Sequence, residues 1–330
     1  LAAGALPAAE ARPEMPQVRD LNGRKAFFVD GGPFLILGLQ WDCDTPFARE
    51  ISDPLYAPAA KMGCNTAVLP LYWREIEPEE GKYDLSGLDH RIELARRHGL
   101  RVVLVWFASY KNGCLNYAPD FVKAGTGRFR RAHRADGTEL RNFSCPTSEE
   151  TFSADRKAVE AVFRRLKLID GERQTVILFQ MENEAGLLGT DRCYCPVCIR
   201  EFEKGGWAAR EGPRAAEAFT AHSIAIYEDR LTAAAKRIYP LPVYVNAWLG
   251  SKQGAPGKSY PSGGPVERVL DVYARAVKQI DFIAPDIYSH SLDFFRTVSK
   301  GYSGKGWPLY IAEHSSGKDG RAERNVFYAL

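Results

Sequence analysis

The sequence has no excess of charge of one sign and no long apolar run. Its 44 Lys and Arg residues balance 41 Asp and Glu residues, and the formal net charge is +3. No basic stripe is available to follow a phosphate backbone, so we expect no nucleic-acid partner. No apolar run approaches the roughly 18 residues of a membrane span. A G-x-G-x-x-G motif after the first apolar strand is also lacking, which disfavours a dinucleotide-binding fold.

The first 20 residues differ from the rest of the chain. They lack an initiator Met, and "LAAGALPAAEA" is rich in Ala and small residues, which is typical of the end of a secretory signal peptide. A disordered Ala-rich arm is the alternative interpretation. We therefore expect an exported protein, periplasmic or extracellular, in which residues 21–330 form a single catalytic domain.

Short apolar runs alternate with longer amphipathic stretches from residue 34 onward, a pattern typical of βα units. In the helical stretch after the third run, Phe152, Val159, Val162, Phe163, Leu166 and Ile169 share one face. Runs that are apolar throughout indicate parallel strands buried on both faces, so we predict a (β/α)8 TIM barrel. Seven strands are identifiable, at residues 34–40, 65–72, 101–107, 175–180, 242–248, 281–288 and 308–314.

The eighth strand of the barrel is apparently absent from these 330 residues. A barrel with an open edge exposes unpaired backbone groups. We expect that either a further C-terminal segment or a second chain completes the barrel.

Two glutamates follow strands that lie far apart in the sequence. Glu184 ends the fourth strand, and Glu313 ends the seventh. Active sites of such barrels lie at the C-terminal ends of the strands, so both carboxylates should meet at one rim. Paired carboxylates about 5 to 5.5 Å apart hydrolyse glycosides with retention of configuration. A structural ion pair at the rim is the alternative for either residue.

The segment around Glu184 also resembles a known family. "QMENE" (180–184) and "WREIEPEEGKYDLSGLD" (73–89) are similar to motifs of the retaining β-galactosidases of glycoside hydrolase families 35 and 42. "VWFASYKNGCLNYAPDFVK" (105–123) most resembles the family 35-like branch. The resemblance implies that Glu184 is the acid/base, Glu313 the nucleophile and Asn183 a ligand of the sugar 2-hydroxyl, while Glu182 has a supporting role.

Aromatic residues at the strand ends are candidate sugar-binding residues, because flat rings offer area to the apolar faces of sugars. We select Trp73, Trp106, Trp248 and Tyr288, and packing at the top of the barrel is the alternative for any one of them. By the same resemblance, Tyr288 would hold the nucleophile.

Three cysteines are clustered shortly after Glu184. Cys193, Cys195 and Cys198 lie within six residues, and Cys145 is the best candidate for a fourth ligand. Four thiolates at such spacing can hold a structural Zn²⁺, and family 42 carries a similar cluster. Disulfide pairing is the alternative, since export would favour it.

We therefore predict a retaining exo-β-glycosidase, in particular a β-galactosidase, that binds a carbohydrate substrate and needs no cofactor for catalysis. Two alternatives stay open: a carbohydrate-binding protein on a degenerate barrel, and a transglycosylase.

Overall fold

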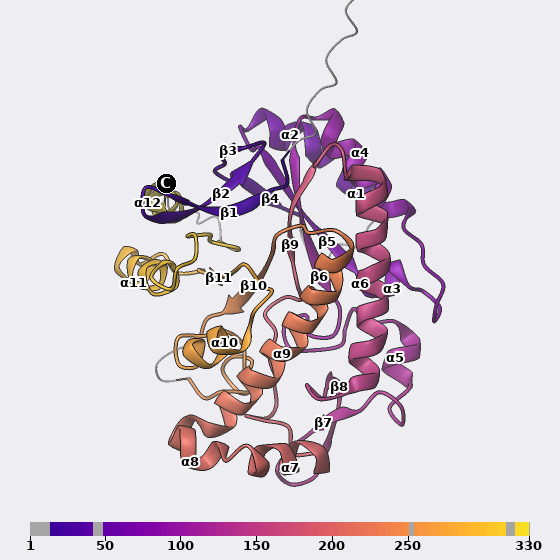
Figure 1. Cartoon of the computed structure of the whole chain (residues 1–330), viewed down its shortest axis with the longest axis vertical. Coiled ribbons are helices and arrows are strands. Elements are labelled where there is room, and N and C mark those ends of the chain that lie inside the picture. The colour runs from indigo at the N-terminus through magenta and orange to yellow at the C-terminus, as the bar shows by residue number, and fades with distance from the viewer. Residues whose placement is uncertain (1–13, 42–48, 251–253, 315–320, 330) are drawn as a thin grey trace, which may run out of the picture.

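The computed structural model describes residues 14–41, 49–250, 254–314 and 321–329 (Figure 1). Its centre is a curled sheet in which every neighbouring pair of strands is parallel and the strands follow one another in chain order. The strands are β4 (Gly38–Gln40), β5 (Thr66–Tyr72), β6 (Arg101–Phe107), β9 (Val176–Gln180), β10 (Val243–Trp248) and β11 (Phe282–Asp286). A single parallel bridge from Asp286 to Glu313 adds the segment around residue 313 to the sheet.

The sheet of the described residues is a half-barrel, consistent with part of a TIM barrel. The five inner predicted strands agree with the structure, but the two outer ones are shorter than predicted. The first run yields only the three residues of β4, and the seventh forms only the bridge at Glu313. Both lie at an edge, where within the described ranges only one neighbouring strand pairs with them. Because each run forms backbone hydrogen bonds with a neighbour on one side only, few of its residues pair as a regular strand.

Helices cover the outer face of the sheet, as βα units require. Figure 1 shows α6 and α9 side by side outside the strands. The predicted apolar face of α6 is confirmed, because five of its six residues are buried and Ile169 packs against the same core. The helices that follow the strands are α4 (Ser86–Arg97), α6 (Glu149–Asp170), α9 (Ala215–Ile238), α10 (Leu270–Ala276), α11 (Leu292–Ser303) and α12 (Arg321–Ala329).

Shorter helical segments lie in the connections. They are α1 (Arg49–Ser52), η1 (Asp53–Leu55), α2 (Tyr56–Lys61), α3 (Trp73–Ile76), α5 (Asp120–Ala124), α7 (Pro196–Lys204), α8 (Trp207–Glu211) and η2 (Gly212–Arg214). A two-stranded antiparallel hairpin, β7 (Arg131–His133) and β8 (Glu139–Ser144), lies between β6 and α6.

Side chains of the central strands alternate between two cores, except in β9, where a register shift against β6 places both Ile177 and Leu178 in the inner one. In β6, Val102, Leu104 and Trp106 belong to the cluster that faces the helices, whereas Val103 and Val105 belong to the cluster inside the curled sheet. This period of two is the ordinary geometry of a strand. Residues of one parity therefore point into the half-barrel, and the others point away from it.

A small antiparallel sheet precedes the half-barrel, and its first strand begins within the first 20 residues. It consists of β1 (Gln17–Leu21), β2 (Arg24–Val29) and β3 (Gly32–Pro33). Phe27 and Val29 pack into the inner core beside the first residues of the central strands. The predicted arm of residues 1–20 therefore ends in a paired strand, while residues 1–13 lie outside the described part of the chain.

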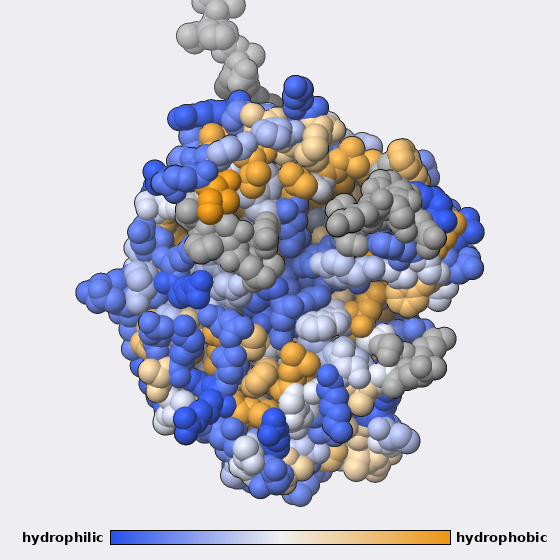
Figure 2. Space-filling view, turned by 180° about the vertical axis from the view of Figure 1, so that it is seen from behind, coloured by the Kyte–Doolittle hydropathy of each residue, from blue (hydrophilic) through white to orange (hydrophobic). Residues whose placement is uncertain are grey.

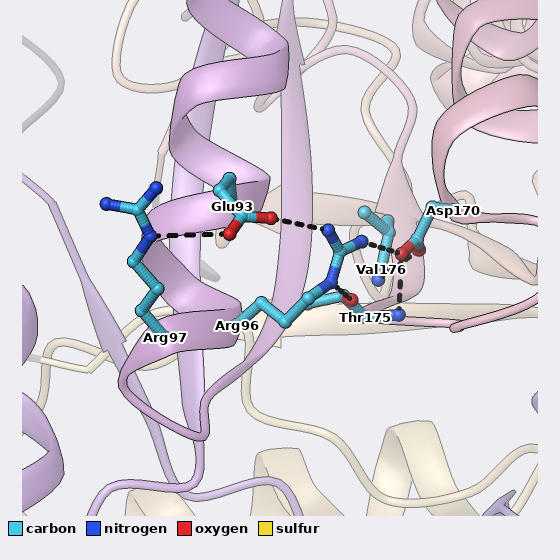
Figure 3. Close-up of polar contacts among 6 residues, drawn as sticks. All are labelled: Glu93, Arg96, Arg97, Asp170, Thr175 and Val176. Atoms are coloured by element: carbon cyan, nitrogen blue, oxygen red, sulfur yellow. Dashed lines mark hydrogen bonds and ion pairs between the residues drawn. The ribbon is translucent and has the colours of Figure 1, made fainter.

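An ion-pair network fixes the N-terminal end of β9 (Figure 3). The Asp170 carboxylate, which is fully buried, accepts hydrogen bonds from the backbone N–H groups of Thr175 at 3.0 Å and Val176 at 2.7 Å. The Arg96 guanidinium donates to the same carboxylate at 2.8 Å and to the Thr175 hydroxyl at 3.0 Å. A buried carboxylate needs such partners, and here they join α4 and α6 to the strand that leads to Glu184.

The outer surface is mixed in polarity. On the face shown in Figure 2, hydrophilic residues surround separate apolar patches. Among the described residues, no helix has both the length and the apolar character that crossing a membrane requires.

Candidate active site

Three carboxyl groups meet at the C-terminal ends of the strands. Glu184 follows β9, Asp286 ends β11, and Glu313 lies at the bridge beside it. One carboxylate oxygen from each residue lies within 4.8 Å of those of the other two. The structure therefore brings together the predicted pair, Glu184 and Glu313, and adds a third carboxyl group that was not predicted.

The Glu184 side chain is held by an irregular turn after β9. Glu182 and Glu184 have φ angles of 57° and 48°, a left-handed conformation that is costly for residues other than Gly. The Glu184 N–H donates to Asn246 Oδ1 at 2.7 Å, which ties the turn to β10. Strain of this kind persists where surrounding contacts enforce it, and it is common at functional sites.

The acid–base properties of Glu184 follow from its surroundings. Burial, and secondly the negative charge of Glu313, raise the pKa of the Glu184 carboxyl to about 7, while the Lys111 ammonium opposes this increase. Glu184 can therefore hold a proton near neutral pH, as a general acid must.

Glu313 accepts two hydrogen bonds from neighbouring side chains. Tyr288 donates its hydroxyl to Oε2 at 2.5 Å, and Asn246 Nδ2 lies 3.4 Å from Oε1. Burial and the charge of Glu313 raise the pKa of the Tyr288 phenol, which therefore remains a donor. The predicted contact of Tyr288 with Glu313 is present in the structure.

Asp286, like its neighbour Asn246, is a site residue that sequence reasoning missed. Its Oδ2 accepts a hydrogen bond from Asn246 Nδ2 at 2.8 Å. Burial is the main cause that raises its pKa well above the usual range, followed by the charges of Glu313 and Glu184. A signal was available, because Asp286 shares the inward parity of Phe282 and Ala284 and ends its strand.

Glu182 serves the architecture of the site. Its two carboxyl oxygens accept the backbone N–H groups of Ser109 at 3.1 Å and Tyr110 at 2.9 Å. Burial first, and then the neighbouring Asp155, raise its pKa well above the usual range. Its side chain is thus engaged by the loop after β6 and lies outside the three-carboxyl cluster. These contacts agree with the supporting role expected for it.

Asn183 is buried between three neighbouring polar side chains. Its Oδ1 accepts Gln180 Nε2 at 3.1 Å, and its Nδ2 donates to Asn112 Oδ1 at 3.3 Å. Asn246 Nδ2 lies 3.5 Å from the Oδ1 atom of Asn183. Asn183 therefore lies beside the carboxyl cluster in a fixed orientation.

Two of the predicted aromatic positions are corrected by the structure. Trp73 and Trp106 are fully buried, and their ring N–H groups donate to Glu77 Oε2 at 2.8 Å and Asp155 Oδ1 at 2.9 Å. Both belong to the core beneath the helices, so neither ring can contact a substrate. Trp106 has the outward parity of β6, and Trp73 begins α3 just beyond β5.

The other two aromatic positions remain candidate sugar contacts. Trp248 ends β10 with 36% of its surface exposed, and Tyr288 is 57% exposed. Trp248 has the same inward parity as Tyr244 and Asn246, so its ring lies at the rim of the half-barrel.

Four cysteines form a second cluster. Cys145 follows β8, and its Sγ lies 3.6, 3.7 and 3.5 Å from those of Cys193, Cys195 and Cys198. All four are buried, and none is in a disulfide. A Zn–S distance of about 2.3 Å places tetrahedral sulfur atoms about 3.8 Å apart, whereas a disulfide bond is about 2.05 Å long. The thiol geometry therefore fits a metal better than disulfide pairing.

Comparison with known proteins agrees with the carboxyl geometry. Residues 48–211 match the family model of glycoside hydrolase family 42, which is described as beta-galactosidase. Together with the beta-galactosidase relatives and structures described below, this match indicates a glycoside hydrolase. The three comparisons support the family 42 part of the resemblance and give no support to the family 35 part. The matched residues include Glu184 and the four cysteines, but Glu313 lies beyond them.

The curated relatives match over less than half of this chain. The beta-galactosidase BgaA of Thermus sp. is 32% identical over 136 residues, which are 41% of this chain and 19% of the relative. BgaH of Haloferax lucentense is 30% identical over 142 residues, or 42% and 19% of the two chains. The aligned region thus spans about a fifth of the length of each relative.

Solved structures share the fold over most of the chain. A beta-galactosidase from Halorubrum lacusprofundi superposes with a TM-score of 0.68 at 19% identity, over 89% of this chain and 51% of that one. One from Marinomonas ef1 gives 0.65 at 15%, over 89% and 52%. The catalytic domain of a beta-amylase from Paenibacillus polymyxa gives 0.65 at 10%, over 88% of both chains. Since these identities are low, they show the fold alone.

Proposed function

We propose that this protein is a retaining exo-β-glycosidase with Glu313 as nucleophile and Glu184 as acid/base. The observation that carries the proposal is the approach of their carboxylate oxygens to within 4.8 Å at the rim of the half-barrel. Retaining enzymes hold their carboxyl groups about 5 to 5.5 Å apart, whereas inverting enzymes separate them by about 6.5 to 9.5 Å to admit a water.

The reaction proceeds in two displacements. The Glu313 carboxylate, oriented by Tyr288 and Asn246, attacks the anomeric carbon while Glu184 gives its proton to the departing oxygen. Once Glu313 is esterified, its negative charge no longer raises the pKa of Glu184. Glu184 then takes a proton from the incoming water, which attacks the anomeric carbon and releases Glu313.

The proposed substrate is a terminal β-linked galactoside of an oligosaccharide or glycan. The support is the family 42 match and the beta-galactosidase names of the relatives. Asn183 is proposed to hydrogen-bond the sugar 2-hydroxyl, an interaction that strengthens in the transition state. Trp248 is proposed as a platform for a sugar face.

Azide rescue tests both roles in one design. With 2,4-dinitrophenyl β-galactoside, Glu184→Ala should still form the intermediate, and azide should convert it to the β-galactosyl azide. Glu313→Ala should lose hydrolysis, and azide should displace the leaving group directly to give the α-azide. Glu217→Gln is the control, because Glu217 is a buried carboxyl bonded to Tyr260, outside the cluster. Full activity in both Ala variants would refute the assignment.

A zinc site is proposed for the cysteine cluster. Cys145, Cys193, Cys195 and Cys198 would supply four thiolates, which close the coordination sphere and leave the metal a structural role. The site would fasten the loop that carries Glu184 to the segment before α6. Arg130 Nε, 3.4 Å from Cys145 Sγ, would partly balance the thiolate charge.

Metal analysis and thermal unfolding test the zinc proposal. We expect one zinc per chain, and in Cys198→Ser the loss of this zinc should cost about 4 kcal/mol, the effect of a ligand near 1,000 times its dissociation constant. Because the unfolding entropy of 330 residues is about 0.7 kcal/mol/K, that cost should lower Tm by about 6 °C. Cys64→Ser, a half-buried cysteine outside the cluster, should change neither quantity. Absence of zinc from the purified protein, with disulfides mapped among these residues, would overturn the proposal.

A further inference from the structure

We infer that Asp286 is a positioning residue that stays protonated and donates a hydrogen bond to Glu184. This hydrogen bond stabilises the carboxylate that forms when Glu184 protonates the leaving group. The inference rests on the proposed function, because it assigns a partner to the proposed acid/base. Asp286 acts through Glu184 and is not required to contact the substrate.

The geometry provides for a carboxyl-to-carboxyl hydrogen bond. Asp286 is 3% exposed, and its carboxyl lies within 4.8 Å of those of Glu184 and Glu313. Its Oδ2 accepts the Asn246 amide, whereas its Oδ1 meets no N–H or hydroxyl donor among the described residues. Oδ1 is thus the oxygen that can carry a proton, and the Glu184 carboxyl, one oxygen of which lies within 4.8 Å of an Asp286 carboxyl oxygen, is the acceptor that we assign to it.

The charges around Asp286 favour its neutral form. Like charges this close, two of them on buried residues, cannot all ionise, and Lys111 is a cation that acts on both Asp286 and Glu184. Burial and the two glutamates raise the pKa of Asp286 well above the usual range. The other titratable groups that interact with Asp286 are the phenols of Tyr244, Tyr288, Tyr302 and Tyr310, whose pKa values are all raised.

The proton of Asp286 matters most in the transition state. As the glycosidic C–O bond breaks and the Glu313–carbon bond forms, the proton of Glu184 moves to the leaving oxygen and negative charge develops on Glu184. The hydrogen bond from Asp286 then becomes charge-assisted and stronger. Stabilisation that grows between ground state and transition state raises the rate. Asp286 keeps its proton throughout, so the one proton that is transferred in this step is the proton that moves from Glu184 to the leaving oxygen.

Leaving-group dependence separates this role from simple packing. Asp286→Ala removes the donor, and kcat/KM should fall about 100-fold for a methyl β-galactoside, the usual loss for a removed transition-state donor. For 2,4-dinitrophenyl β-galactoside, whose leaving group needs no proton, the loss should stay within about 5-fold. Equal losses for both substrates would overturn the inference.

Asp286→Asn provides an isosteric comparison that retains a neutral donor. Its amide oxygen can accept from Asn246 while its nitrogen donates to Glu184, so the alkaline limb of kcat/KM should stay within about 0.3 pH units of wild type. If Asp286 is ionised instead, the Asn variant removes a negative neighbour, and the limb should move down by about one pH unit. This second outcome would also overturn the inference.

An infrared measurement keeps the inference separate from the proposed function. The wild type should show a protonated-carboxyl band at neutral pH that Asp286→Asn lacks and the control Glu217→Gln retains. The band needs no catalysis, so a wild type without glycosidase activity would refute the proposed function and leave this readout intact. Absence of a band that depends on Asp286 would refute the inference, even if the Ala variant fails to fold.

Discussion

Replacing Glu313 by Gln should lower the pKa of Glu184 from about 7 to about 6. The increase above the usual 4.5 corresponds to about 3.4 kcal/mol. Two unit charges 4.8 Å apart interact by about 3.5 kcal/mol at an effective dielectric constant of about 20. The charge of Glu313 is nevertheless the second cause, behind burial, and Lys111 opposes it, so we assign it about 1.4 kcal/mol.

The assay is a carbon-13 NMR titration of protein labelled at the glutamate carboxyl carbon. The Glu184 resonance is assigned as the signal that disappears in Glu184→Gln. A pKa that stays near 7 in Glu313→Gln would show that the two carboxyls do not interact, and a decrease to 4.5 would show that burial contributes little. Because Glu184 must carry a proton to act as an acid, hydrolysis by the wild type should decline as the pH rises through about 7.

Two further pairs of variants test the fold and the aromatic positions. Arg96→Ala should lower the free energy of unfolding, measured with urea, by about 3 kcal/mol, because it leaves the buried Asp170 carboxylate without its cation. The control Arg97→Ala, at an exposed position on the same helix, should leave the unfolding midpoint unchanged. A small effect of Arg96→Ala would mean that the backbone N–H groups suffice for Asp170. Trp106→Phe should cost about 1–2 kcal/mol of stability through its lost hydrogen bond and leave KM unchanged, whereas Trp248→Ala should raise KM several-fold with little loss of stability. An increase in KM for Trp106→Phe alone would contradict the burial argument.

The central sheet and the approach of Glu184 to Glu313 were predictable because both follow from simple rules. Apolar runs buried on both faces indicate parallel strands, and the rule that barrel chemistry lies at strand C-termini selected Glu184 and Glu313. The same rule, applied with the period of two, selects Asp286 and Asn246 and rejects Trp106. The sequence prediction did not take into account the side of the sheet to which each residue of a strand points.

Other features depend on contacts that no local pattern specifies. The β1–β2 hairpin had a signal in Asn22–Gly23, whose φ angles of 52° and 80° suit a tight hairpin turn. No comparable signal shows that Phe27 and Val29 fill the inner core, or that Glu182 binds the backbone of the loop after β6. These contacts join segments far apart in the chain, so they follow from the assembled sheet.

The most direct test of the proposed mechanism is mass spectrometry of the protein after reaction with an activated 2-deoxy-2-fluoro-β-galactoside. The fluorine slows breakdown of a glycosyl-enzyme intermediate, and the account predicts one covalent sugar per chain, mapped to Glu313. An adduct on another residue would contradict the assignment of the nucleophile. No adduct from folded protein with the galactose, glucose, xylose or arabinose reagents would contradict the retaining mechanism itself.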